Sequence, residues 1–429
     1  RILGTRRTML MGAMVLAIGY ALMIVPGQGV FFLFAALGVI VVGNGMFKAN
    51  AGNLVRKIYE GDDAKIDSAF TIYYMAVNIG SMISMLLTPW IKDYVNQHYG
   101  GGFGWHAAFA VCCVGLLVGL GNYAVMRHTL AHIGSEPDHK PLVWKKFAAV
   151  LAGAVAVVVI SAFILNYEEV ARIFVYLAGA VVLLIFGYLI AMSDRGERSG
   201  LIVALVLTIQ TVFFFIFYQQ MSTSLNLFAL RNVDWNQTLF GIHLFTWKPA
   251  QFQALNPIWI FLLSPLLAWI YNAAARRNKD ISIASKFVLG FVVVAIGFFI
   301  YSIAGHFAVD GKTSSWVMIL GYGFQSLGEL LVSGLGLAMI ARYVPARMGG
   351  FMMGAYFVAV GISQYFGGMV ATLASVPSNI NNPVQSLPIY TDLFNKLGYA
   401  GVVCVIIALI VLPFMNRLSR THSEASQGA

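Results

Sequence analysis

Charged side chains are scarce in this sequence. Only 10% of its 429 residues are Asp, Glu, Lys or Arg, whereas 59% are hydrophobic and the mean hydropathy is +0.79. A soluble protein of this length has too little interior to bury so much apolar surface. The composition therefore excludes a large soluble α/β protein and indicates that lipid is the solvent for most of the chain.

Cysteine is scarce as well, and the histidines are scattered. Cys112, Cys113 and Cys404 fall inside apolar segments, so they offer neither a disulfide framework nor the spacing of metal ligands. The eight histidines lie in loops or at the ends of apolar segments, away in sequence from any deep carboxylate. A membrane hydrolase needs a Ser, His and Asp set or clustered metal ligands. We therefore expect no enzyme activity, no metal and no other cofactor.

The alternation of apolar and polar residues that marks a transmembrane β-barrel is also missing. Continuous apolar blocks such as residues 151–165, LAGAVAVVVISAFIL, favour helices, which satisfy their own backbone hydrogen bonds in lipid. A spanning helix needs about 20 apolar residues. The twelve candidate segments are 8–25, 30–55, 67–91, 106–126, 146–165, 169–192, 201–219, 253–274, 286–308, 315–341, 349–375 and 398–415. The predicted fold class is an all-α, polytopic membrane protein.

These segments fall into three blocks. Residues 1–130 hold four of them, and residues 201–429 hold six. Between them, residues 131–200 hold a polar stretch and two strongly apolar segments with almost no polar residue at mid-depth. This pattern predicts a lipid-facing helical hairpin. Two halves of six helices are a common architecture of transporters. We therefore expect the first two helices of such a fold to precede this sequence, which also starts without Met.

The predicted topology explains the net charge of +10 through the distribution of basic residues, so no nucleic-acid partner is required. If the first residues are cytoplasmic and the segments alternate, 20 of the 27 Lys and Arg residues fall on the inner side and six near the outer side. This asymmetry is the positive-inside rule. We expect a multi-pass protein of the inner (plasma) membrane, with both ends of this chain cytoplasmic and the loop at 220–250 outside.

Two charges lie within the membrane, where an ionisable side chain costs roughly 3 kcal/mol. Glu329 lies near the centre of its segment, with Gln325 one turn before it on the same face, and Lys48 lies about a turn and a half inside the cytoplasmic end of its own. Lys48 could also snorkel to the surface, whereas Glu329 is too deep. The pair predicts a cavity lined by a cation and an anion, which suits a zwitterion such as a peptide or an amino acid.

Uncharged polar residues extend this predicted cavity. Asn78 lies well inside an apolar helix, although a hydrogen bond to a neighbouring helix would also explain it. Gln220 belongs to a polar cluster at residues 218–226, YQQMSTSLN. Asn256 precedes Pro257, where we expect the helix to break and leave a carbonyl free, although Asn256 could instead cap a helix.

Several motifs resemble the proton-dependent oligopeptide transporters of the major facilitator superfamily. FTIYYMAVNIGSM (70–82) is similar to the family's central signature, and GNGMFKAN (43–50) to its Gly-x-Gly-x-x-Lys-x-Asn on the fourth helix. LGTRR resembles the end of the loop between the second and third helices. YQQMSTSLNLFA, QALNPIWI and QSLGELLVSGLGLAM resemble the seventh, eighth and tenth helices. The resemblance covers essentially the whole chain and implies the superfamily fold. It also implies that the two strongly apolar segments within residues 131–200 are linker helices of the kind seen in bacterial members.

The resemblance implies a role for each candidate residue. The implied substrate-binding residues are Lys48, Asn78, Gln220, Asn256, Glu329 and Tyr356. Lys48 would contact the C-terminal carboxylate of a peptide, Glu329 and Asn256 would hold its amine, and Asn78 would touch its backbone. The other two would line the pocket, with Tyr356 standing where a tryptophan is common in the family. Lys48 and Glu329 would also couple transport to protons.

The implied function is a proton-coupled symporter that imports di- and tripeptides by alternating access. Its expected partners are peptides, protons and the lipid bilayer, and we expect a monomer. The family's Glu-x-x-Glu-Arg-Phe motif, which lies on the first helix, is not found in this sequence. The alternative is a superfamily transporter of another small solute, either for uptake of nitrate or another anion or for drug export. Glu329 argues against an anion, which has no use for a deep carboxylate.

Overall fold

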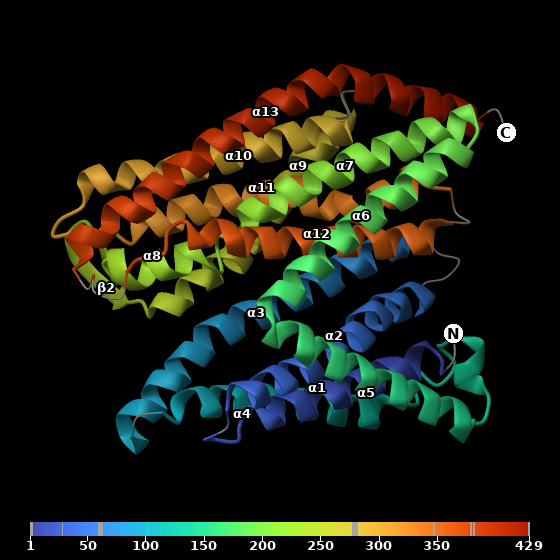
Figure 1. Ribbon diagram of the computed structural model, residues 1–429, viewed down its shortest axis with the longest axis horizontal. Helices are drawn as coiled ribbons and strands as arrows, with labels where there is room; N and C mark the ends of the chain where they lie inside the picture. Colours follow the sequence, from blue (N-terminus) through green and yellow to red (C-terminus); the bar gives the residue numbers. More distant parts are fainter. Residues whose placement is uncertain are drawn as a thin grey trace. The chain divides into compact units, whose positions relative to one another are not determined.

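The computed structural model describes residues 3–27, 29–58, 63–100, 102–276, 282–345, 348–377, 380 and 382–427 (Figure 1). In this part of the chain, a long helix stands at each of the twelve predicted segments. These helices are α1 (Thr5–Leu22), α2 (Val30–Ile58), α3 (Asp63–Tyr99), α4 (Gly104–Met126), α5 (Trp144–Asn166), α6 (Glu168–Met192), α7 (Arg195–Gln219), α9 (Leu255–Arg276), α10 (Ile283–Ile303), α11 (Trp316–Tyr343), α12 (Gly349–Thr372) and α13 (Pro383–Gln427). The predicted all-α polytopic fold is confirmed.

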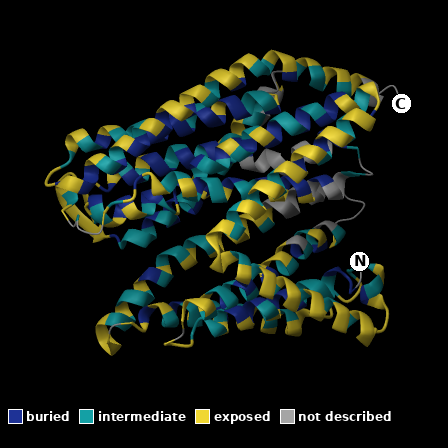
Figure 2. Cartoon of the chain, in the orientation of Figure 1, coloured by how far each residue is buried: buried dark blue, intermediate teal, exposed yellow. Residues whose placement is uncertain are grey.

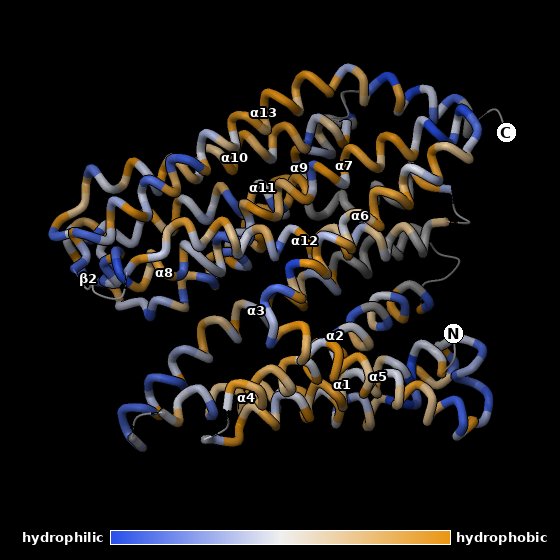
Figure 3. The backbone as a smooth tube through the Cα atoms, viewed as in Figure 1, coloured by the Kyte–Doolittle hydropathy of each residue, from blue (hydrophilic) through white to orange (hydrophobic). Residues whose placement is uncertain are grey.

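The composition of these helices suits a membrane. By length and composition, nine helices within the described residues can cross a bilayer. Figure 3 shows hydrophobic residues along most of their length and hydrophilic residues gathered at their ends. In the most apolar stretch of α10, 56% of the residues are buried inside the protein. In the most apolar stretch of α5, only 6% are buried. Helix α10 therefore belongs to a protein core, whereas α5 has few buried residues, and its predicted lipid-facing position stays a prediction.

The segment between α7 and α9 contains structure that the sequence did not predict. We expected a polar loop at residues 220–250. It holds a short helix, α8 (Ser224–Asn232), two antiparallel strands, β1 (Asn236–Leu239) and β2 (Ile242–Thr246), and the 3₁₀ helix η2 (Pro249–Ala254). Phe240 and Gly241 form the tip of the hairpin with φ of 49° and 80°. Two residues at positive φ are typical of the tight turns that join such strands.

Two helix boundaries also differ from the expectation. Helix α13 runs from Pro383 to Gln427, well beyond the predicted apolar segment 398–415. We expected the helix to break at Pro257. Helix α9 instead begins at Leu255, so Pro257 lies in its first turn and does not interrupt it. Pro383 and Pro257 each lie in the first turn of their helix. Proline is tolerated there because an N–H group in the first turn has no partner within the helix.

Contacts divide the chain into two compact units, Arg1–Ile173 and Phe174–Ala429. In the first unit, α1 packs on α2 and α4, and α5 packs on α2. The backbones of α1 and α2 approach closely at glycines. A Cβ atom on Gly12 would lie 2.5 Å from the Phe47 nitrogen, and one on Gly43 would lie 2.6 Å from the Leu16 nitrogen. This tight contact sets the position of α2, the helix that carries Lys48.

In the second unit, glycines place α11 against α10. A Cβ atom on Gly321 would lie 2.2 Å from the ring of Tyr301, and one on Gly328 would lie 2.7 Å from Val294 Cγ2. Helix α11 also packs on α7 and α9, and the buried residues of the unit follow these facing sides (Figure 2). With one face closed against α10, α11 directs Glu329 towards α7 and α9.

Helix α1 begins against the segment that follows α4. The backbone N–H groups of Arg6 and Arg7 donate to the carboxylate of Asp138, at 3.3 and 3.1 Å, and the N–H of Thr5 donates to Ser135 Oγ at 2.9 Å. Asp138 lies in the 3₁₀ helix η1 (Glu136–His139) and is 4% exposed. The segment thus satisfies the N–H groups that the first turn of α1 leaves free.

Replacing Asp138 with Asn should destabilise the protein at neutral pH but not in acid. Burial raises the pKa of Asp138, but hydrogen bonds from Ser135, Arg7 and Arg6 outweigh it and hold that pKa below its ordinary value. A carboxyl with a lowered pKa in the folded state stabilises the protein above its unfolded pKa, and this stabilisation is lost as the pH falls through the folded value. We expect Asp138→Asn to lower the free energy of unfolding by about 2 kcal/mol at pH 7. Thermal unfolding of the full-length protein in detergent, between pH 7 and about pH 2, where the carboxyl is protonated even with its lowered pKa, measures the effect.

The matched control is Asp194→Asn. Asp194 occupies the N-cap position of α7, is exposed, and makes no hydrogen bond to the first turn through its side chain. This variant should unfold at nearly the wild-type temperature at every pH. A similar loss in both variants, or a loss for Asp138→Asn that persists in acid, would show that the Asp138 charge does not hold the start of α1.

Candidate functional site

Glu329 lies buried in the second unit, where α7, α9 and α11 meet. Its side chain is 7% exposed. Asn256 Nδ2 of α9 donates a hydrogen bond to Glu329 Oε2 at 2.7 Å, and the Tyr218 side chain of α7 forms a second hydrogen bond to the carboxylate. Asn256 Nδ2 also donates to Ser326 Oγ at 3.1 Å, one turn before Glu329 on α11. Three helices therefore converge on one carboxylate.

The partners of this carboxylate are neutral. Among the residues that the structure describes, no Lys, Arg or His forms an ion pair with Glu329. A carboxylate has about four acceptor positions, so two hydrogen bonds leave capacity for another donor. A charge held out of water by neutral groups is compensated most strongly by an opposite charge. The arrangement is therefore suited to receive a cation such as a primary ammonium, or a proton.

Asn256 reaches Glu329 because of how α9 begins. The 3₁₀ helix η2 runs directly into α9, which places Asn256 in the first turn with its side chain directed across to α11. The two residues to which the resemblance gives the peptide amine are therefore in direct contact with each other, and their role stays a prediction. The amide nitrogen of Asn256 thus links α9 to α11.

Gln220 and Tyr356 lie inside the second unit and are already hydrogen-bonded. Gln220 is 0% exposed; its Nε2 donates to the carbonyl of Gly367 on α12 at 3.0 Å, and its Oε1 accepts from Ser224 Oγ at 2.7 Å. Tyr356 of α12 is 4% exposed and shares a hydrogen bond with Thr211 of α7. In this conformation both side chains join α7 to α12. Their predicted place in a pocket lining stays a prediction.

The other two candidates belong to the first unit. Lys48 lies on α2, and its side chain is exposed. Asn78 lies half-buried on α3, and its Nδ2 donates to the Tyr74 carbonyl of the same helix at 2.9 Å. Among the described residues no donor bonds to the Asn78 side-chain oxygen, which can therefore accept a hydrogen bond.

Tyr218 and Ser326 are members of the Glu329 cluster that we did not single out from the sequence. Ser326 lies three residues before Glu329, a spacing that places two side chains on neighbouring positions of one helix face. Helical periodicity could therefore have found it. Tyr218 lies on α7, far away in sequence, and within the polar cluster at 218–226 nothing local distinguishes it from Gln219 or Gln220.

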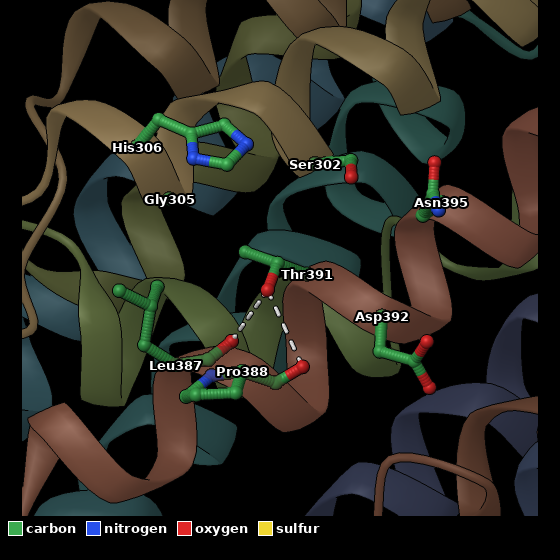
Figure 4. Close-up of a pocket in the computed structure, with 8 residues that line it drawn as sticks. All are labelled: Ser302, Gly305, His306, Leu387, Pro388, Thr391, Asp392 and Asn395. Carbon is green, nitrogen blue, oxygen red and sulfur yellow. Dashed lines mark hydrogen bonds between the residues drawn. The ribbon is translucent and has the colours of Figure 1, made fainter.

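A separate polar hollow of about 320 Å³ lies where the end of α10 meets the start of α13 (Figure 4). Its polar groups are largely exposed or already paired. His306 and Asp392 are exposed, Asp392 pairs with Lys396 at 2.7 Å, and Thr391 Oγ1 donates to carbonyls of its own helix. It offers no buried charge to a ligand, so Glu329 marks the stronger candidate site.

A family model described as the POT family matches residues 6–388. The chain belongs to the POT family. The resemblance seen in the motifs is thereby confirmed, and it extends over nearly the whole chain. Curated relatives of this POT chain are transporters, so the prediction that it is not an enzyme is also confirmed.

The POT chain is similar to proteins from several bacteria. It is 40% identical over 433 residues to dipeptide and tripeptide permease B of Yersinia enterocolitica, covering 100% of this chain and 84% of that protein. It is 39% identical over 430 residues to dipeptide and tripeptide permease A of Salmonella typhimurium, covering 100% and 83%. The crystal structure of tetrameric PepTSo2 matches with a TM-score of 0.88 and 68% identity over 97% of this chain and 85% of that one. Because that neighbour is a tetramer, our expectation of a monomer stays a prediction.

Proposed function

We propose that this POT-family chain is a proton-coupled symporter that imports di- and tripeptides by alternating access. The names of its relatives as dipeptide and tripeptide permeases support the substrate class. The observation that carries the proposal is the buried carboxylate of Glu329, which Asn256 and Tyr218 hold without a basic partner among the described residues. A short peptide brings the ammonium group that such a site can bind.

The proposed peptide clamp has two charged ends. Glu329 and Asn256 receive the amine, and Lys48 receives the C-terminal carboxylate, so each charged group of the substrate meets an opposite charge. Asn78 contacts the peptide backbone through its side-chain oxygen. Gln220 and Tyr356 contribute to the lining, and their hydrogen bonds between α7 and α12 support a role in shaping it.

Proton coupling is proposed to act through Lys48 and Glu329. An ion pair between Lys48 and a carboxylate is released when the carboxylate takes a proton, and the freed ammonium then attracts the peptide. Proton and peptide thus favour the same conformational change, and the proton gradient drives uptake. The exposed position of Lys48 within its own unit supports this role, because its ammonium is accessible to both partners.

Uptake of a labelled dipeptide by the full-length protein in proteoliposomes tests the proposal. An inward proton gradient should drive accumulation above the outside concentration, and a protonophore should abolish it. An excess of unlabelled tripeptide should compete, whereas nitrate should not. Gradient-driven nitrate uptake without peptide uptake would instead establish the alternative, a superfamily transporter of another solute. Glu329 disfavours that alternative, since a buried carboxylate repels an anion.

The chain is a multi-pass membrane protein, and the proposed orientation places both of its ends in the cytoplasm. The proposal rests on the 20 of 27 basic residues that fall on that side. Phe240, at the tip of the hairpin, is 96% exposed and should lie outside. A cysteine placed there should react with an impermeant reagent in intact cells, and reaction only after lysis would reverse the orientation.

A further inference from the structure

An apolar hollow of about 310 Å³ lies between α9, α10 and α11 in the second unit. Eight aliphatic side chains, Tyr271 and Lys286 line it. Leu331 at its back is 5% exposed, whereas Leu266 and Leu289 at its rim are 51% and 43% exposed. The hollow is thus open on the side where a membrane helix meets lipid. A concave apolar surface gains dispersion contacts when a hydrocarbon chain fills it.

One end of this hollow carries two polar groups. Lys286 lies in the first turn of α10, and its Nζ lies 4.2 Å from the centroid of the Tyr271 ring. Within the described part of the chain, no carboxylate forms an ion pair with Lys286. The Tyr271 hydroxyl is buried and has no hydrogen-bond partner there. A buried polar atom without a partner is uncommon, and a hydrogen bond to a bound group would satisfy it.

We propose that this hollow binds an anionic phospholipid. One acyl chain packs against the aliphatic walls, the phosphate accepts a hydrogen bond from Lys286 Nζ, and the buried Tyr271 hydroxyl turns outward to donate to the same phosphate. Arg276, exposed in the last turn of α9 and five residues after Tyr271, adds a second positive charge on the same helix. Basic pockets between membrane helices on the cytoplasmic side commonly bind anionic headgroups. A zwitterionic headgroup fits less well, because its own cation would approach these basic residues.

The lipid site is separate from the proposed peptide site, although both use α11. Leu327 and Leu331 line the hollow and lie two residues before and after Glu329. Two residues correspond to roughly 200° around a helix, so these side chains face away from Glu329. A bound lipid would therefore support α11 from its membrane side. The inference goes beyond peptide transport and does not depend on it.

Thermal stabilisation of the full-length protein in mixed micelles tests the proposal. Phosphatidylglycerol should raise the unfolding temperature at lower concentration than phosphatidylcholine, and inorganic phosphate alone should have no effect. Lys286→Gln should weaken the apparent affinity for phosphatidylglycerol about tenfold, because a charge-assisted hydrogen bond is lost. Tyr271→Phe should weaken it less. Leu289→Trp should fill the rim and reduce binding while the basic groups remain.

The matched control is Lys312→Gln. Lys312 Nζ also lies over an aromatic ring, 5.6 Å from the centroid of Trp235, but Lys312 lies in the segment between α10 and α11 and outside the hollow. This variant should keep the wild-type response to phosphatidylglycerol. Equal responses to both lipids, stabilisation by phosphate alone, or equal losses in the Lys286 and Lys312 variants would each overturn the proposal. Retained binding in folded Leu289→Trp would show that the acyl chain lies elsewhere.

Discussion

Glu329→Gln should weaken the binding of a free dipeptide about tenfold or more, and should weaken the binding of its N-acetylated form much less. The substitution keeps the size of the side chain and its ability to accept from Asn256, but it removes the charge. A charge-assisted hydrogen bond contributes roughly 1.5–3 kcal/mol, and each 1.4 kcal/mol is a factor of ten. The acetylated peptide has no ammonium and so has no such bond to lose. Equilibrium binding of both ligands to the full-length protein measures the difference.

Glu169→Gln is the control for this experiment. Glu169 is an exposed carboxylate near the start of α6 that pairs with Arg172, so the variant removes one negative charge outside the proposed site. Its affinity for both ligands should stay at the wild-type value. If Glu329→Gln instead weakens both ligands equally, Glu329 does not hold the amine. It would then serve the packing of α7, α9 and α11 or the path of the proton.

The membrane helices could be predicted because apolar length is a local property of the sequence. Residues 106–126 were expected to span the membrane, and α4 runs from Gly104 to Met126. The prediction was poor where a helix continues into water. Helix α13 extends from Pro383 far beyond its apolar segment, and there an ion pair between Asp392 and Lys396, one turn apart, supports a polar stretch. Hydropathy reports the crossing of the bilayer and says little about where a helix ends.

The hairpin of β1 and β2 could not be predicted for a different reason. Its strands hold only four and five residues, too few for a clear alternating pattern. Contacts distant in sequence stabilise it. Trp316 Nε1 donates to the Thr238 carbonyl at 2.8 Å, and Ser315 Oγ donates to the Asn236 carbonyl at 3.2 Å. Tertiary packing therefore overrides the composition that suggested a loop.

The candidate site was predicted in part, because the sequence shows how deep a polar residue lies in the membrane but does not show its contacts. The burial of Glu329 followed from its position in an apolar helix, since a charge there is costly and is rarely kept without a use. The same reasoning selected Gln220, whose amide proves to be satisfied by Gly367 and Ser224. From sequence, a deep polar group that binds a neighbouring helix looks like one that binds a ligand. Only the contacts distinguish them.

Lys48→Ala should abolish the proton-driven accumulation of peptide while leaving exchange of peptide across the membrane measurable. In the proposed mechanism, protonation of a carboxylate releases the exposed ammonium of Lys48, so coupling would depend on the charge of the lysine. Without it, peptide still binds through its amine at Glu329 and moves down its own gradient. Two assays on the full-length protein in proteoliposomes separate these outcomes: accumulation under an imposed proton gradient, and counterflow of labelled against unlabelled dipeptide.

Two further variants show how a loss of proton-driven accumulation in Lys48→Ala is to be interpreted. Lys57→Ala removes a lysine from the same helix, nine residues further on, whose Nζ donates to the Gly134 carbonyl at 3.0 Å, and it should keep proton-driven accumulation. Lys48→Arg keeps the charge in a larger, planar group and should restore part of the coupling. Loss of both accumulation and counterflow in Lys48→Ala would show that the lysine is needed for binding itself. Retained accumulation would show that protons act through another residue, and the charged clamp would then rest on Glu329 alone.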